Sequence, residues 1–229
     1  MPNDTPSAAP LLWLLLLLSV TTGMVDAISV LGLGKVFTAN MTVNIVFLGF
    51  AAAGTPGFHV GPYLAAIIAF LTGALIAGRV GKHHAGLPLR RWLLAAACVE
   101  AALFWIAAAV ASGFDIASQT PGVSLYAIIA LTGLAMGFRN ATIRQLKVPD
   151  LTTTVLTLTV TGLAADSRLA GGSNPNWARR LGSVLAIFAG AAMGALLVGH
   201  GGLVAPLILA GALVLAGTLA CMAYPAAKA

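Results

Sequence analysis

Two segments of the sequence place hydroxyl, amide and carboxyl groups directly before a short apolar run. They are residues 35–53, KVFTANMTVNIVFLGFAAA, and residues 147–165, KVPDLTTTVLTLTVTGLAA, and an alignment without gaps at an offset of 110 positions matches Asn40 with Asp150. Each apolar run has about a dozen residues, whereas a helix needs about 20 to cross a bilayer. Polar, irregular backbone is tolerated in a membrane only where it is buried in protein or lines a cavity. We therefore expect the functional site here, with one contribution from each segment.

Asn40 and Asp150 stand where the N-caps of two half-helices are expected. The start of a helix presents free N–H groups and the positive end of its dipole, which favour an anion or another polar ligand. The candidate binding residues of the two segments are Asn40, Thr42, Asn44, Asp150, Thr152, Thr153 and Thr154. Together they can bind a small ion or polar solute without covalent chemistry.

Asp26, Arg139 and Asn140 complete the candidate binding residues. Asp26 matches Asn140 when the two halves are aligned, and a carboxylate inside a span often serves as a proton or cation relay. A structural partnership between Asp26 and Arg139 is the alternative, and both roles can hold at once. Arg139 follows a span, where snorkelling to the interface competes with anion binding as its explanation. Glu100 also has two interpretations. It has a functional role, or it reaches the membrane interface or pairs with a neighbouring basic residue.

The sequence offers little for catalysis or for cofactors. His83 and His84 have no carboxylate or thiol at ligand spacing, so we expect no metal site. Ser, His and Asp occur in no arrangement that suggests a nucleophile with its base. No phosphate-binding loop or dinucleotide fingerprint is present. We therefore expect neither an enzyme nor a cofactor-binding protein.

Composition indicates a polytopic membrane protein. Hydrophobic residues make up 59% of the chain and charged residues 8%, and the mean hydropathy is +0.98. Soluble domains are about 45 to 50% apolar, and a soluble helical bundle needs charged faces that the long uncharged runs exclude. The net charge is +6, and the basic residues that produce it lie at the ends of the apolar segments. This distribution is typical of residues that set the orientation of a membrane protein, so we expect no nucleic-acid partner.

We expect an all-α protein with six transmembrane helices and two short broken or re-entrant half-helices, arranged as an inverted repeat. The expected spans are residues 11–31, 61–80, 92–112, 123–138, 181–198 and 203–223. The first resembles the apolar region of a signal peptide, but no Lys or Arg precedes it, so a retained helix is favoured. The expected units are an N-terminal tail (1–10), two membrane repeats (11–114 and 115–224) and a C-terminal tail (225–229).

The basic residues decide the expected topology. If the two short segments do not cross, all of the Lys and Arg residues except Lys35 fall on one side of the membrane. The positive-inside rule makes that side cytoplasmic, with both termini there. If the short segments crossed, this bias would vanish. Inverted repeats with interrupted segments at matching positions are typical of secondary transporters.

The segments GMVDAISVLGLGKVFTANMTVNIVFLG and GFRNATIRQLKVPDLTTTVLTLTVTGLAAD resemble the paired signature segments of the YoaK family. These are bacterial inner-membrane proteins with a domain of unknown function, so the resemblance implies a plasma-membrane location. Family members usually carry Asn-Met-Thr-Gly-Asn where this chain has Val43 in place of the glycine, which bears on how closely a ligand can approach the backbone. The half-helix arrangement is also similar to the substrate-site helices of SulP-type transporters, at the level of fold alone.

Three functions are compatible with these observations. The leading hypothesis is a small secondary transporter for a small anion or polar solute, with Asp26 or Asp150 coupling a proton or cation. A passive channel and a non-transporting scaffold or sensor are the alternatives. The expected partners are the lipid bilayer and the solute, and we expect copies of this small unit to associate, as in a homodimer.

Overall fold

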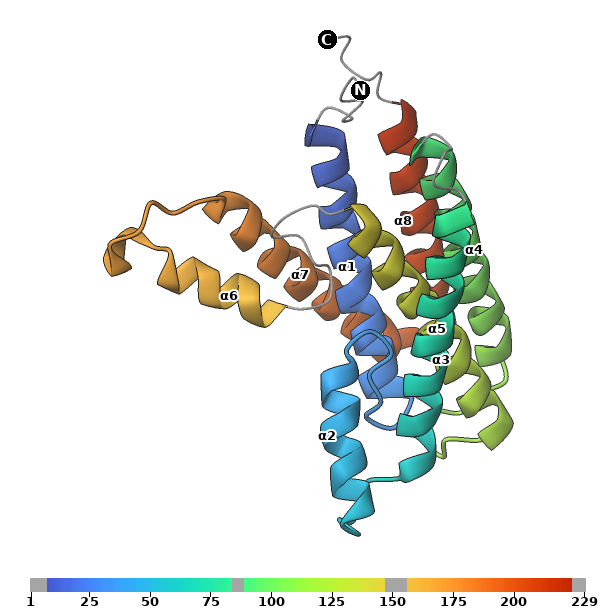
Figure 1. Cartoon of the computed structure of the whole chain (residues 1–229). Helices are drawn as coiled ribbons and strands as arrows, with labels where there is room; N and C mark the ends of the chain where they lie inside the picture. Colours follow the sequence, from blue (N-terminus) through green and yellow to red (C-terminus); the bar gives the residue numbers. More distant parts are fainter. Residues whose placement is uncertain (1–7, 84–88, 147–155, 224–229) are drawn as a thin grey trace.

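The structure is a computed structural model that describes residues 8–83, 89–146 and 156–223, and all named elements in these ranges are helices (Figure 1). In chain order they are α1 (Ala8–Gly32), α2 (Met41–Ala52), α3 (Val60–His83), α4 (Leu89–Ala111), α5 (Gly122–Leu146), α6 (Leu156–Ala165), the short 3-10 helix η1 (Arg168–Ala170), α7 (Trp177–Gly201) and α8 (Val204–Ala223). The predicted all-α class is therefore confirmed.

Six of the helices are long and apolar enough to cross a membrane, and they match the six predicted spans. The remaining two apolar helices, α2 and α6, have 12 and 10 residues, well below the length that spanning requires. In Figure 1 the start of α1 and the end of α8 lie at the same end of the molecule. An even number of crossings requires this arrangement.

The predicted end of the fourth span at Phe138 is wrong, because α5 continues to Leu146. The polar residues after Phe138 do not stop the helix, since they bond to its own backbone. The side-chain amide of Asn140 donates to the Met136 carbonyl (2.8 Å), and the hydroxyl of Thr142 donates to the Phe138 carbonyl (2.9 Å). Arg139 is consequently an interior residue of a helix.

The long helices pack in pairs through close backbone contact. In the pair α1 and α7, a Cβ added at Gly23 would lie 2.1 Å from the Ile187 carbonyl oxygen, and one at Gly190 would lie 1.9 Å from that of Val20. Only glycine permits helices to approach this closely. At these two glycines the backbones of the helices are in direct contact.

The pair α3 and α5 repeats this contact. A Cβ added at Gly73 would lie 2.1 Å from the Leu134 carbonyl oxygen, and one at Gly137 would lie 2.0 Å from that of Phe70. Gly137 is also the residue that aligns with Gly23. Both crossings thus depend on glycine, while the arrangement of the halves as an inverted repeat stays a prediction.

The remaining packing brings α1, α4, α5 and α8 together in the centre of the molecule. The core contains side chains of all four helices, such as Leu15, Phe104, Ile129 and Leu207. Helix α1 is the most buried of the six candidate spans. By contrast, Figure 1 shows α6 and the start of α7 projecting to one side and α2 lying at the opposite end from the chain termini. The polar groups described next lie in the central part.

Candidate functional site

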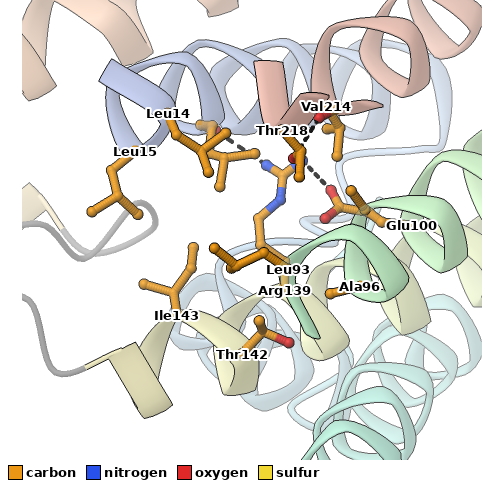
Figure 2. Close-up of a pocket in the computed structure, with 12 residues that line it drawn as sticks. Leu14, Leu15, Leu93, Ala96, Glu100, Arg139, Thr142, Ile143, Val214 and Thr218 are labelled. Carbon is orange, nitrogen blue, oxygen red and sulfur yellow. Dashed lines mark hydrogen bonds and ion pairs between the residues drawn. The ribbon is translucent and has the colours of Figure 1, made fainter. Parts of the chain in front are cut away.

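Arg139 of α5 lies inside the central group of helices and is only 2% exposed. Its Nη2 forms an ion pair with Oε1 of Glu100, a buried residue of α4 (Figure 2). A guanidinium with this burial is not snorkelling to a membrane interface. Of the two readings of Glu100, pairing with a basic residue is the one the structure shows.

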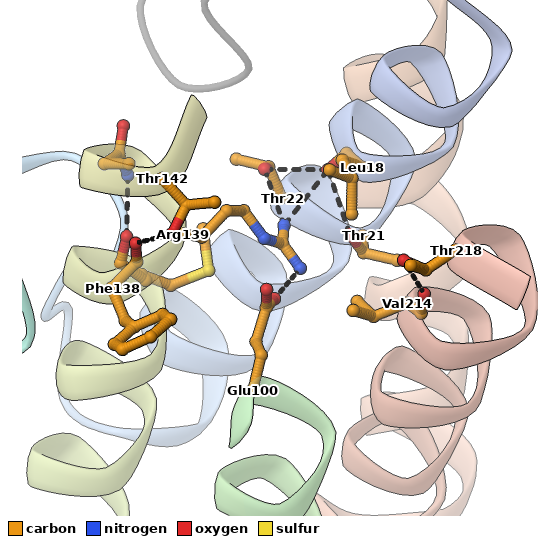
Figure 3. Close-up of polar contacts among 11 residues, drawn as sticks. Leu18, Thr21, Thr22, Glu100, Phe138, Arg139, Thr142, Val214 and Thr218 are labelled. Carbon is orange, nitrogen blue, oxygen red and sulfur yellow. Dashed lines mark hydrogen bonds and ion pairs between the residues drawn. The ribbon is translucent and has the colours of Figure 1, made fainter. Parts of the chain in front are cut away.

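Helix α1 supplies the other partners of the guanidinium (Figure 3). Nη1 of Arg139 donates to the Leu18 carbonyl (3.1 Å) and to the Thr22 hydroxyl oxygen (3.0 Å). The Thr22 hydroxyl in turn donates to the Leu18 carbonyl (2.9 Å), which leaves its oxygen available to accept from Arg139. Residues 18 and 22 are four apart and share one face of α1. Arg139 thus joins three helices.

A small pocket adjoins this ion pair (Figure 2). Its volume is about 30 Å³, which is room for about one or two water molecules. The polar groups in its lining are Glu100, Arg139, Thr142 and Thr218, and the rest of the lining is apolar. Nε of Arg139 is buried and has no hydrogen-bond partner among the described residues. The site therefore has an unused donor and a little space beside it.

Burial makes this ion pair sensitive to the loss of either member. Removing two charges from water costs several kcal/mol per ion, and mutual attraction offsets this only when the hydrogen bonds are good. The guanidinium has three such partners, Glu100, Thr22 and Leu18. Within the lining of the pocket, Glu100 is the one acidic side chain. Its carboxylate therefore supplies the local balance of charge.

Asp26 lies on α1 one turn beyond Thr22. Its Oδ1 is buried and accepts no hydrogen bond from any described residue. The alternative that Asp26 is the structural partner of Arg139 is wrong, because that partner is Glu100. A charged carboxylate with an unpaired oxygen in this position would be costly within a membrane.

The predicted residues at the start of α2 occupy three different environments. Asn40 is the N-cap residue, as predicted, but its side chain makes no capping hydrogen bond. Thr42 is exposed. Asn44 is buried, and its side-chain amide accepts from the Phe37 N–H (2.9 Å) and donates to the Phe37 carbonyl. These hydrogen bonds hold the loop that precedes α2 against the helix.

The structure brings together only some of the predicted site residues. Asn140 adjoins Arg139 in α5, whereas α2 packs against α3, and no hydrogen bond that the structure records connects α2 with Arg139. Asp150, Thr152, Thr153 and Thr154 lie outside the described residues. The binding roles of all these residues stay predictions.

Sequence reasoning did not single out Thr22, Thr142 and Thr218. Each of these hydroxyls bonds to a backbone carbonyl of its own helix, which is the usual way that threonine is accommodated in an apolar helix. The signal in the sequence was Thr21-Thr22 within a largely apolar run. The pattern could not show which hydroxyl faces another helix.

Comparisons with known proteins agree with the resemblance seen in the two polar segments. The model of a family described as "Protein of unknown function (DUF1275)" matches residues 14–220. The UPF0700 transmembrane protein YoaK of Bacillus subtilis (strain 168) is 36% identical over 157 residues, which are 67% of this chain and 65% of that relative. The chain thus spans somewhat less than two thirds of the length of this relative. No solved structure matches the chain.

Proposed function

Since the chain belongs to the family of proteins of unknown function DUF1275, whose description assigns no activity, we propose a function from its geometry. The protein is a small secondary transporter, or permease, for a small anion or polar solute. Transport is coupled to a proton or another cation. It has no catalytic step and no cofactor.

The observation that carries this proposal is the buried oxygen of Asp26, Oδ1, which has no hydrogen-bond partner among the described residues and lies in the most buried candidate span. A buried charge without a partner is costly, so a structural role alone does not account for it. Binding a proton or a cation neutralises the carboxylate. Asp26 is therefore the residue to which we assign coupling.

The architecture supports the same proposal. Two short apolar helices, α2 and α6, accompany six spans, and two pairs of spans cross through glycines. Interrupted segments in matching halves mark the solute site of many secondary transporters. We assign solute binding to the surroundings of Arg139 and Asn140, with contributions from Asn40, Thr42 and the segment that contains Asp150.

We place this multi-pass protein in the bacterial plasma membrane with both chain ends in the cytoplasm. The common position of the start of α1 and the end of α8 in Figure 1 supports this orientation. Arg139 is buried and no longer counts toward the charge bias. The other basic residues on that predicted side still outnumber Lys35, so the positive-inside argument stands.

Uptake into proteoliposomes that contain the full chain tests the proposal. A panel of small anions and neutral polar solutes is offered with and without an inward proton or sodium gradient. We expect at least one solute to accumulate only with a gradient, and the variant Asp26→Asn to abolish accumulation. Asp166→Asn, which changes a carboxylate that is 45% exposed, is the matched control and should leave uptake unchanged.

Two results would contradict the proposal. Flux that ignores every gradient would indicate a passive channel. Accumulation that persists in Asp26→Asn would remove the assigned coupling residue. Reconstitution of each variant to the same protein density, checked by gel, keeps these outcomes separate from poor insertion.

A further inference from the structure

The guanidinium of Arg139 has a hydrogen-bond donor, Nε, that its contacts with neighbouring helices leave unused. Its Nε is buried with no partner among the described residues, and the pocket beside it is lined by that same side chain. Glu100 supplies the carboxylate on Nη2, while Thr22 and Leu18 take Nη1. Two of the three nitrogens are therefore occupied, one of them by an anionic group.

We infer that Arg139 is the binding site of a small monovalent anion, for which the carboxylate of Glu100 is an exchangeable internal substitute. When Glu100 takes up a proton, its charge disappears and the guanidinium needs another anion. An anion that enters the pocket takes the place of the carboxylate beside Arg139. The inference deepens the proposed function, on which its role in transport rests, by naming the substrate class and a second proton-binding group.

Charge balance determines the class of anion. The proton and the anion enter together, so the site carries the same net charge before and after the exchange. A divalent anion would leave one negative charge uncompensated in an apolar pocket, which is costly. The pocket of about 30 Å³ has space for only about one or two waters. Chloride, nitrate and formate fit these limits, whereas sulfate and gluconate do not.

Other ionisable groups do not take over this exchange. Apart from Glu100, the ionisable residues of α4 are Arg90, Arg91 and Cys98, and α5 adds Tyr126 and Arg144 to Arg139. From α1 the titratable residue is Asp26, one turn beyond Thr22, and from α8 it is Cys221, beyond Thr218. None of these additional residues belongs to the lining of the pocket. Glu100 is thus the acid that faces Arg139.

Thermal unfolding of the full chain in detergent micelles tests the site without any transport. The variant Glu100→Gln is compared in sodium chloride and in sodium gluconate at equal ionic strength and neutral pH. Chloride should raise its unfolding temperature by about 5–10 °C at about 100 times Kd. Wild type should show a smaller rise that grows as the pH falls, because its carboxylate competes with chloride.

Two variants provide the controls. Glu100→Gln combined with Arg139→Gln replaces the pair by neutral amides and should show no difference between chloride and gluconate. Asp166→Asn breaks the ion pair with Arg180 and should respond to the two salts as wild type does. An equal chloride response in the double variant, or none in Glu100→Gln, overturns the inference.

Proton uptake by the unmodified protein provides a second test that does not depend on how a variant folds. When chloride is added to weakly buffered wild-type protein, the protein should take up one proton from the solution for each anion that binds. When gluconate is added, it should take up none. Chloride binding without proton uptake overturns the exchange.

Gradient-driven uptake that depends on Asp26, with no response to chloride in these two tests, defeats this inference alone. A chloride response without gradient-driven accumulation of any solute defeats the proposed transport function and leaves the site in place.

Discussion

Among the described residues, two arginine–carboxylate pairs can be compared, and they differ chiefly in their surroundings. In the central pair, the side chains of Arg139 and Glu100 are 1% and 5% exposed. In the other, which links the residue after α6 to the first turn of α7, those of Arg180 and Asp166 are 11% and 45% exposed. Bulk water therefore screens the second pair more than the first. The comparison teaches that the residue types alone do not set what an ion pair contributes.

Breaking the central pair should have the largest effect. Glu100→Ala leaves the guanidinium buried without a counter-charge, so we expect the free energy of unfolding to fall by about 3–5 kcal/mol. Unfolding in mixed micelles with increasing denaturing detergent measures the loss. The neutral double variant, Glu100→Gln with Arg139→Gln, should recover most of it, and a double variant as unstable as the sum of its single changes would contradict this explanation.

Removing one neutral partner of the buried guanidinium should cost less. Thr22→Val keeps the shape of the side chain and removes the hydroxyl that accepts from Arg139, a loss of about 1.5–3 kcal/mol for a hydrogen bond to a charged group. Thr21→Val is the matched control, because the hydroxyl of Thr21 bonds to the Leu18 carbonyl. The same unfolding measurement should show a smaller loss for Thr21→Val, and equal losses would exclude a special role for Thr22.

The pair of Arg180 and Asp166, in which the carboxylate is exposed, should contribute less than the central pair. We expect Asp166→Asn to lower the free energy of unfolding by less than about 1 kcal/mol. High salt should reduce that difference further, since it screens charges that face water. A loss larger than that of Thr22→Val, or one that salt does not change, would show that burial does not separate the two pairs.

The smallest effect should come from Asp115, a fully exposed carboxylate in the loop between α4 and α5. The Ser118 hydroxyl and the Ala117 N–H donate to it and hold its pKa below the ordinary value of 3.8. A lowered folded-state pKa stabilises the protein above the unfolded-state pKa, and this stabilisation disappears as the pH falls through the folded-state pKa. Wild type should therefore unfold at slightly higher temperature than Asp115→Asn at about pH 6 and lose that advantage near about pH 3. A difference that grows toward low pH would reverse the sign of this prediction.

The fold was largely predictable because bilayer thickness constrains it. A crossing needs a long apolar run, so six spans and two shorter segments could be recognised from hydrophobicity alone. The end of α5 was not predictable from the same rule, since Asn140 and Thr142 look like residues that end a helix. Their side chains bond to carbonyls one turn earlier, which only the local geometry reveals.

The site was less predictable because it depends on contacts between distant residues. Arg139 could be identified as unusual, but no pattern of residues distinguished Glu100 from Asp26 as its partner. Asn44 carries an amide suited to binding a ligand, yet both ends of that amide are used by Phe37. Chemistry of single residues thus indicated candidates, and the packing of helices decided their roles.

The glycine crossings have a mechanical consequence. Where glycines bring their backbones into contact, α1 and α7 cannot separate or roll over each other without losing that contact, and the same holds for α3 and α5. Each pair must move as a rigid body. Arg139 belongs to the pair of α3 and α5, and it donates hydrogen bonds to Leu18 and Thr22 in the pair of α1 and α7. Any motion of one pair relative to the other therefore has to break these hydrogen bonds first.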